Sequence, residues 1–367
     1  VGSSSQRIEL AVSLEPHDLP FQHRVLRYPP ASTMRISRPS MHSVEALDGL
    51  DPRPVFQGFS QCLPGTPSPP GPPNFWFNFG DSYSQTGFNA TGPLPNTSNP
   101  IGNPQFPGYT AAGGENWVGF VASSYNNSVL YTYNYADSDA IIDASLVTAS
   151  KPSVLSLADQ VDQFMSSVAS RPDTTPWTSD NALFSVWIGG NDIGYLYDSG
   201  EDQSTFLLHA NPNAGTLDQN YDAGARSFLF ANVPPIDRSP LMLNQSLTSQ
   251  ALEKSVIATF NSKLQDRVNA FQSSHSEVLP FIPINLNVKT FFWDTNAQFS
   301  DIFDNPYYFG FKDATSYGSD ANMFWVDEYH PGVLLMFEAR RIDDGIVSAN
   351  RLFGQTVGLK VLVNTVW

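Results

Sequence analysis

A serine, a histidine and a carboxylate in this chain have the types and settings that nucleophilic catalysis requires. Ser82 follows a glycine and an acid shortly after the aromatic run 75–77, so it would sit where a buried strand opens toward solvent. A serine nucleophile needs a base to take its proton and an acid to orient that base. His330 has Asp327 three residues before it, close enough on a tight turn for the carboxylate to reach the imidazole. The competing interpretation of both segments is an ordinary turn, since short motifs of this kind also arise by chance.

A side-chain amide is placed to stabilise the negative oxygen of a tetrahedral intermediate. Asn191 follows the double glycine 189–190, which comes directly after the apolar run 182–188. The glycines would let the backbone approach a substrate closely, although a Gly-Gly-Asn turn is common by itself. Asn191 is therefore a candidate oxyanion donor.

The elements that must position these groups alternate along the chain. Apolar and β-branched runs predict strands at 75–77, 129–135, 182–188, 227–233 and 278–284. Apolar residues at helical spacing predict helices over 156–170 and 249–272. This alternation predicts an α/β domain with a mostly parallel sheet, in which ligands bind beyond the carboxyl ends of the strands. Ser82 and Asn191 both follow such ends.

Composition limits the classes of protein to consider. An apolar content of 41% with 13% aromatic residues is enough for a substantial core, and no run approaches the ~18 apolar residues of a membrane span. The 19 basic and 35 acidic residues give a net charge of −16, which disfavours nucleic acid and anionic membranes as partners. Cys62 is the one cysteine, so neither an intramolecular disulfide nor a cysteine metal cluster is expected.

The two ends of the chain differ from its middle in composition and in hydrophobic pattern. Residues 1–73 are rich in proline and serine without a sustained period, which predicts a disordered leader or, as a second possibility, a segment absent from the mature protein. The catalytic domain is expected to span 74–347. The remaining segment, 348–367, is a C-terminal tail of unclear role.

The sequence signals for localisation conflict. Four sequons, which fit a secreted glycoprotein, begin at Asn89, Asn96, Asn126 and Asn244. The first residues carry no apolar h-region, although the opening Val1 indicates that the natural start could lie upstream. We expect an extracellular protein.

Three ordered motifs together resemble a known enzyme family. They are the segments 79–82, 189–192 and 327–330, with the sequences FGDS, GGND and DEYH. In this combination and order they resemble the GDSL-type serine esterases of the SGNH-hydrolase superfamily, over about residues 74–340. Within that superfamily the chain most resembles fungal acetylesterases of carbohydrate esterase family sixteen, through segments such as 116–119 (NWVG) and 223–226 (AGAR).

The resemblance implies a fold and a set of roles. The fold would be a flavodoxin-like three-layer α/β/α sandwich. Ser82 would be the nucleophile, His330 the base and Asp327 the residue that orients it. The oxyanion hole would use the Ser82 N–H, the Asn191 side chain and a backbone N–H at Ser138. No metal or organic cofactor is implied, and the partner would be a small ester bound by a monomer.

One departure from the family pattern falls on the implied oxyanion hole. The family usually has two glycines where this chain has Ser138 and Asp139, next to Asp137. Glycines allow positive φ and close approach at little cost, and two added carboxylates would disfavour a nearby oxyanion. We therefore expect reduced activity. A second departure is the segment 209–215, which lacks an apolar face where a helix is expected and so predicts a weakened layer.

The expected function is a secreted serine carboxylester hydrolase that releases acetyl groups from small sugars or hemicellulose fragments. Two other functions stay open: a lipase-like hydrolase of longer acyl esters, and a degenerate carbohydrate-binding relative without catalysis. Trp117, Trp187 and Trp325 could line a carbohydrate site, although buried tryptophans are more often core. Because the base must be neutral, activity is expected to fall below the ordinary histidine pKa of ~6.5.

Overall fold

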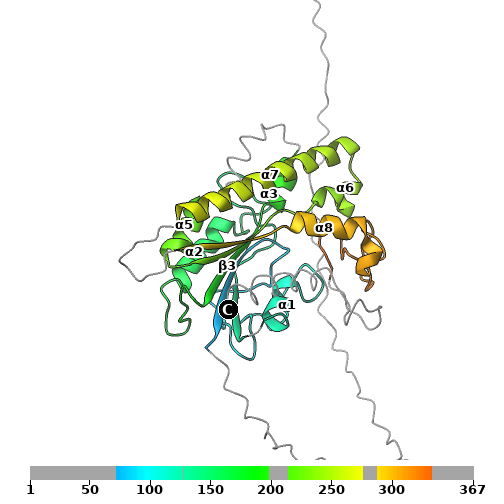
Figure 1. Cartoon of the computed structure of the whole chain (residues 1–367). Helices are drawn as coiled ribbons and strands as arrows, with labels where there is room; N and C mark the ends of the chain where they lie inside the picture. The colour runs from blue at the N-terminus through cyan, green and yellow to red at the C-terminus, as the bar shows by residue number, and fades with distance from the viewer. Residues whose placement is uncertain (1–71, 127, 198–213, 276–286, 333–367) are drawn as a thin grey trace, which may run out of the picture. The chain divides into compact units, whose positions relative to one another are not determined.

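The computed structural model describes residues 72–126, 128–197, 214–275 and 287–332 and contains a single five-stranded sheet in that part of the chain (Figure 1). The strands lie in the order β2-β1-β3-β4-β5, and each neighbouring pair is parallel. Their bounds are β1 Asn74–Gly80, β2 Leu130–Asn134, β3 Ala182–Trp187, β4 Ser227–Ala231 and β5 Lys289–Trp293. This is the flavodoxin-like order, so the predicted fold class is confirmed.

Four of the five predicted strands are present, and one strand was not predicted. The first four predictions correspond to β1 through β4, while the predicted strand at 278–284 lies outside the described residues. β5 is short and only one of its five residues is buried, so its sequence shows neither a long apolar run nor clear alternation.

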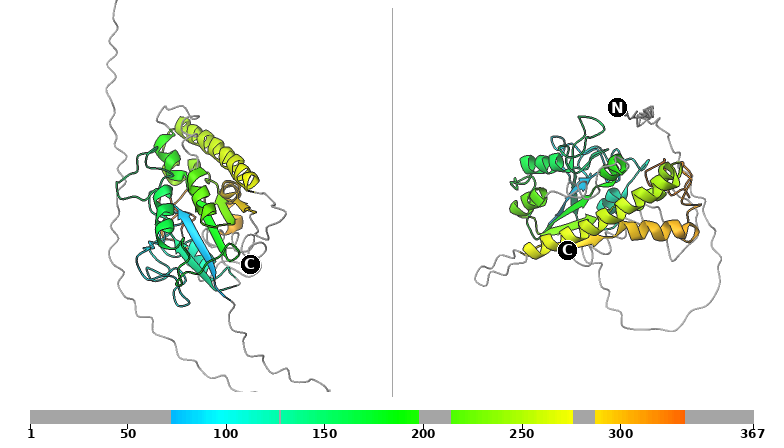
Figure 2. Two further views of the ribbon diagram at one scale, coloured as in Figure 1. Left: turned by 90° about the vertical axis from the view of Figure 1, so that its left-hand side faces the viewer. Right: turned by 90° about the horizontal axis from the view of Figure 1, so that it is seen from above.

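Helices cover both faces of the sheet (Figures 1 and 2). One face carries α2 (Leu157–Ser167), α3 (Gly190–Leu196), α5 (Ala214–Asp222) and α7 (Leu247–Ser274), whose apolar side chains share one core cluster. The other face carries α1 (Trp117–Ser123) and α8 (Thr295–Asp304), which belong to a second cluster. Shorter helical turns are η1 (Ile236–Arg238), α6 (Pro240–Leu243) and η2 (Pro306–Phe309). The predicted three layers are therefore present.

β1 contributes side chains to both core clusters, because successive side chains of a strand point to opposite faces of the sheet. Phe75, Phe77 and Phe79 belong to the first cluster, whereas Trp76 belongs to the second. A strand buried on both faces reads as an unbroken apolar run, which explains why the segment before Ser82 does not alternate. The nucleophile candidate thus follows an interior strand of the sheet, which pairs with β2 on one side and β3 on the other.

The predicted weak layer at 209–215 lies mostly outside the described residues, which resume at 214. A helix, α5, occupies 214–222, and Leu217 and Asn220 of it are buried. Its composition is poor in apolar residues, so contact with α2 and not intrinsic propensity accounts for the helix. Both predicted helices over 156–170 and 249–272 are confirmed as α2 and α7.

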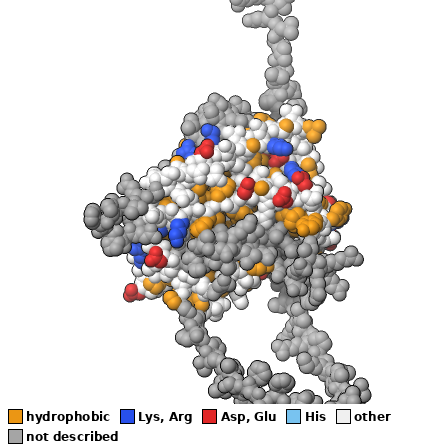
Figure 3. Space-filling view, viewed as in Figure 1, with side chains coloured by type: hydrophobic (Ala, Val, Ile, Leu, Met, Phe, Trp, Pro, Cys, Tyr) orange, Lys and Arg blue, Asp and Glu red, His pale blue; other side chains and the backbone are white. Residues whose placement is uncertain are grey.

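Several predictions concern residues that the structure does not describe. Residues 1–71 of the predicted leader 1–73, the part of the proposed domain beyond 332 and the tail 348–367 all lie outside the described residues. Within the described ranges, no helix is long and apolar enough to cross a membrane. Figure 3 shows acidic and basic side chains close together on the described part of one face, with hydrophobic side chains between them.

Candidate active site

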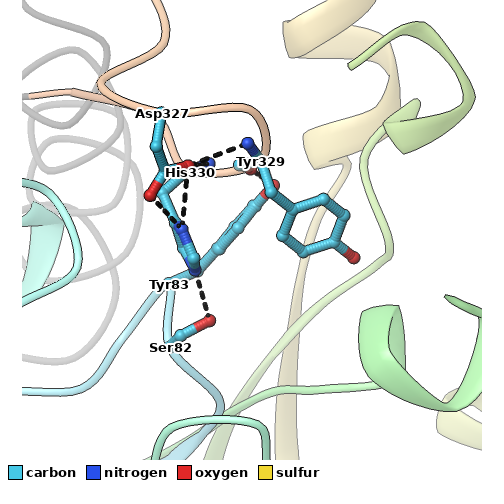
Figure 4. Close-up of polar contacts among 5 residues, drawn as sticks. All are labelled: Ser82, Tyr83, Asp327, Tyr329 and His330. Carbon is cyan, nitrogen blue, oxygen red and sulfur yellow. Dashed lines mark hydrogen bonds and ion pairs between the residues drawn. The ribbon is translucent and has the colours of Figure 1, made fainter. Parts of the chain in front are cut away.

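Ser82, His330 and Asp327 form a continuous chain of hydrogen bonds (Figure 4). The Ser82 Oγ lies 2.9 Å from His330 Nε2, and His330 Nδ1 lies 2.9 Å from Asp327 Oδ2. With a proton on Nδ1 held against the carboxylate, Nε2 is left to accept the proton of the serine hydroxyl. Residues 248 positions apart in the sequence are thereby arranged as nucleophile, base and orienting acid.

Ser82 is presented by a tight turn directly after β1. The carbonyl oxygen of Asp81 accepts the N–H groups of Ser84 and Gln85, both at 3.0 Å. Gly80, the last residue of β1, lies so close to β3 that an added Cβ would be 2.4 Å from the Trp187 carbonyl oxygen. Only glycine fits this contact, so the glycine of the Gly-Asp-Ser motif serves strand packing.

The loop that carries the base and the acid folds back on itself. The Asp327 carboxylate Oδ1 accepts the N–H groups of Tyr329 at 2.8 Å and His330 at 2.7 Å, and the Val326 N–H donates to the His330 carbonyl oxygen. The Tyr83 hydroxyl donates to the Tyr329 carbonyl oxygen at 2.6 Å. Tyr83 therefore joins the turn that carries Ser82 to the loop that carries His330.

Asp327 is held in its ionised form. Burial by itself raises the pKa of this carboxyl, but the hydrogen bond and charge of His330, with the two backbone N–H groups, outweigh burial and lower the pKa below its ordinary value. An ionised Asp327 keeps the Nδ1 proton of His330 in place and can stabilise the imidazolium that forms during proton transfer.

The two other candidate oxyanion donors have hydrogen-bond partners in the protein. The Asn191 side-chain amide donates to the Ala140 carbonyl oxygen at 2.9 Å, which leaves the second hydrogen of its NH₂ group for another acceptor. The Ser138 N–H donates to the Asp137 carboxylate at 3.0 Å. An oxyanion would have to compete with Asp137 for the Ser138 N–H, so that donor is not preformed.

Asp139 adopts the conformation for which glycine is best suited. Its φ is 60°, in the left-handed region, at one of the positions where the family has glycine. Asp tolerates this region better than most residues, because its short side chain can hydrogen-bond locally. Asp139 Oδ2 accepts the Ser150 hydroxyl at 2.9 Å. A carboxylate is therefore held on a left-handed residue in this segment.

Two buried carboxyls stand behind the candidate nucleophile. Asp81 and Asp192 are 6% and 1% exposed, and burial raises the pKa of each to about 7. The N–H of Tyr83 and the charge of His330 partly offset burial at Asp81, and the Ile142 N–H does so at Asp192. Neither was predicted as a site residue, and the acid in each sequence motif was the available signal.

The prediction that three tryptophans bind substrate is wrong. Trp117, Trp187 and Trp325 are 1%, 3% and 0% exposed and belong to the second core cluster. Each indole N–H also has a partner inside the protein: the Ser84 hydroxyl, the Asn232 carbonyl and the Ala314 carbonyl, respectively. Large aromatic side chains bury well in a core, and a buried ring offers no face to a sugar.

A small depression borders the candidate triad. It is lined by Ser82, Tyr83, Ala111, Ala112, His330 and Pro331. Ala111 and Ala112 come from the long loop after β1 and were not predicted to lie near the site, because nothing in their sequence marks them. Among the described residues, no cluster of three or more His, Cys, Asp or Glu side chains is arranged to hold a metal ion.

Comparison with known proteins identifies the chain's relatives. A family model described as GDSL-like Lipase/Acylhydrolase matches residues 77–333. An acetylesterase of Thermothelomyces thermophilus is 42% identical over 71% of this chain and 83% of its own length, and an acetylesterase of Hypocrea jecorina is 23% identical over 82% and 96%. An acetylxylan esterase of Geobacillus stearothermophilus, a solved structure, aligns with a TM-score of 0.38 and 12% identity over 71% of this chain and 87% of that chain.

Proposed function

This chain belongs to the GDSL-like lipase and acylhydrolase family, as its sequence motifs predicted, and we propose that it is a serine acetylesterase. The observation that carries the proposal is the hydrogen-bond chain from Ser82 through His330 to Asp327. The similarity to an acetylesterase at 42% identity supports acetyl as the acyl group. The proposed alcohol is an acetylated sugar or a hemicellulose fragment.

In the proposed mechanism, Ser82 forms and loses an acyl bond. The Ser82 oxygen attacks the ester carbonyl carbon while its proton moves to His330 Nε2, and the carbonyl electrons move to the oxygen. His330 then gives this proton to the departing alcohol oxygen, which leaves an acetyl-serine. Water attacks the acetyl carbon with His330 as base, and the products are acetate and free Ser82.

The oxyanion hole of the proposed site has fewer free hydrogen-bond donors than the family pattern implies. The Ser82 N–H and the second hydrogen of the Asn191 amide are the proposed donors, and the Ser138 N–H joins them only by leaving Asp137. Loss of one donor costs about 10²–10³ in rate. We therefore propose slower turnover than in relatives that have glycines at these positions.

Two alternatives within the proposal differ in measurable ways. A lipase-like hydrolase would prefer longer acyl chains, and a degenerate binding protein would not turn over at all. The small size of the depression beside Ser82 and His330 favours a short acyl group over a long one. Rates on 4-nitrophenyl esters from acetyl to decanoyl test this: a maximum at acetyl is expected, a maximum at octanoyl or decanoyl supports the lipase-like function, and no turnover of any ester refutes catalysis.

We also propose that the protein is extracellular and glycosylated. Asn89 and Asn96 are exposed, as is Asn244, so a glycan could be attached there. Asn126 is half-buried, and its amide donates to two carbonyls at the end of α1, those of Val121 and Ala122, whereas the amide of the exposed Asn96 donates to one, that of Leu94. Expression in a secreting fungal host followed by peptide mass mapping tests the proposal. Glycans are expected on the exposed sequons, and secreted protein without any glycan would contradict it.

A further inference from the structure

A buried glutamine on α2 holds the end of the strand that leads to the candidate nucleophile. Gln160 is 0% exposed, and its side chain reaches Gly80, which lies 80 residues earlier in the sequence. The Gly80 N–H donates to Gln160 Oε1 at 2.9 Å, and Gln160 Nε2 donates to the Gly80 carbonyl oxygen at 2.8 Å. One carboxamide thus satisfies both backbone groups of Gly80.

The β1–β2 ladder leaves the Gly80 N–H without a backbone acceptor, while the Gly80 carbonyl oxygen also accepts the Asp137 N–H from the segment after β2. The ladder between β1 and β2 ends at the pair Asn78 and Asn134, and the next bond on that side runs from the Tyr135 N–H to the Asn78 carbonyl. Backbone groups on one edge of a strand recur every second residue, so Gly80 faces the same side as Asn78. There β2 has already ended, and the Gln160 amide takes the place of the missing strand.

The same glutamine is part of a closed ring of hydrogen bonds. Its second Nε2 hydrogen goes to the Leu155 carbonyl at 3.0 Å, and the Leu155 N–H donates to Asp137 Oδ2 at 2.9 Å. The Asp137 N–H returns to the Gly80 carbonyl oxygen at 3.2 Å. The ring therefore joins the residue two before Ser82 to the residue directly before Ser138.

We propose that Gln160 is a positioning residue that fixes Ser82 relative to the oxyanion segment at Ser138. It acts through Gly80 and touches neither substrate nor reacting atoms. The inference rests on the proposed function in that it takes Ser82 as the nucleophile. Its consequence is that loss of the amide slows the chemical step and leaves substrate affinity nearly unchanged, because a nucleophile displaced by about 1 Å loses about 10² in rate.

The first test replaces the amide by an apolar side chain of similar length. Gln160→Met is expected to lower kcat for 4-nitrophenyl acetate about 10–100-fold while KM stays within about threefold. Gln163→Met, three residues further along the same helix and half-buried, is the matched control and should match the parent. A folded Gln160→Met enzyme with the parent's kcat would overturn the proposal, as would a loss confined to KM.

The second test uses a side chain whose hydrogen bonds depend on pH. A protonated Gln160→Glu carboxyl can accept the Gly80 N–H and donate to the Gly80 carbonyl, whereas its carboxylate form cannot donate. Burial raises the pKa of a carboxyl, so the kcat ratio of this variant to the parent is expected to rise at least about fivefold from pH 9 to pH 6. The proposal fails if that ratio does not change with pH in folded protein.

A probe of the serine itself separates this inference from the choice of substrate. A fluorophosphonate labels an activated serine without any ester turnover, and circular dichroism reports the folded fraction. If the parent labels at Ser82 but hydrolyses no acetyl ester, the proposed function fails, and the labelling rate of Gln160→Met still decides this inference. Slower labelling of the folded variant by about tenfold or more is expected, and an unchanged labelling rate overturns it.

Discussion

Asp192 accepts the Ile142 backbone N–H through Oδ1 at 3.0 Å, while its second carboxyl oxygen is buried and has no hydrogen-bond partner within the described ranges. Asn191, the preceding residue, donates to the Ala140 carbonyl. Two adjacent side chains at the start of α3 therefore hold the segment that follows β2. That segment contains Ser138, so its position depends in part on a carboxyl whose ionisation burial disfavours.

The buried Asp192 carboxyl should make the stability of the protein depend on pH. Burial raises the pKa of Asp192 to about 7 from an ordinary value of 3.8, so between these values the folded protein keeps a proton that the unfolded chain loses. Stability therefore falls as pH rises from about 4 to 7. Asp192→Asn, which keeps the acceptor for Ile142, should flatten the curve of melting temperature against pH in this range.

The exposed Asp162 on α2 provides the control for that measurement. Asp162→Asn should keep the slope of the parent. Asp81, whose pKa burial also raises to about 7, contributes to the same slope, so Asp192→Asn should reduce it and not abolish it. Equal slopes for Asp192→Asn and the parent would show that Asp192 is ionised in the folded protein.

Removing the charge at Asp139 should speed the reaction. The charge of Asp139 is one of the smaller influences that raise the pKa of Asp81, after burial, so its field reaches the turn that carries Ser82. Asp139→Asn keeps a residue that tolerates the φ of 60° and removes a charge that opposes the oxyanion. We expect kcat to rise about two- to tenfold with KM unchanged, measured on 4-nitrophenyl acetate. A fall in kcat would mean that the carboxylate assists the reaction.

Asp327→Asn should abolish most of the activity without unfolding the protein. An amide beside His330 Nδ1 can donate, which favours the tautomer with its proton on Nε2 and leaves no base for Ser82. The expected loss in kcat is about 10³–10⁴-fold. Glu328→Gln, an exposed neighbour, should keep the parent's rate, and equal effects of both substitutions would argue against the orienting role of Asp327.

The buried tryptophans should matter for stability and not for substrate affinity. Trp117 packs edge to face against Trp76, with ring centroids 5.3 Å apart, and its indole donates to the Ser84 hydroxyl. Trp117→Ala is expected to cost about 3–5 kcal/mol of unfolding free energy in a denaturant titration. Tyr307→Ala, at a side chain that is 81% exposed, should cost less than about 0.5 kcal/mol. A stable Trp117→Ala protein with a raised KM for acetylated xylo-oligosaccharides would restore the sugar-binding interpretation.

The sequence predicts well what depends on neighbouring residues. The buried strand before Ser82 and the turn from Asp327 to His330 are local, and the alternation of strands and helices predicts a parallel sheet, while its strand order follows only from the resemblance. The convergence of Ser82 and His330 follows from the resemblance to a family and not from spacing. Burial of all three tryptophans could not be predicted, since an aromatic residue in a pattern does not reveal its environment.

Contacts between distant segments escaped prediction for a physical reason. Gln160 reads as one polar residue of an amphipathic helix, and only the fold brings it to Gly80. The Asp137 carboxylate accepts the Ser138 N–H, and residue propensities cannot predict this hydrogen bond, because it depends on the local geometry of the folded chain. β5 and α5 were missed because packing, and not composition, stabilises them.

In the proposed reaction the Ser82 oxygen attacks the ester, and Ser82→Ala removes that oxygen. The measurement is kcat for 4-nitrophenyl acetate in protein whose melting temperature matches that of the parent. We expect a loss of about 10⁴-fold or more, because the nucleophile and its base act as one unit. A folded Ser82→Ala protein that hydrolyses the ester within tenfold of the parent's rate would contradict it.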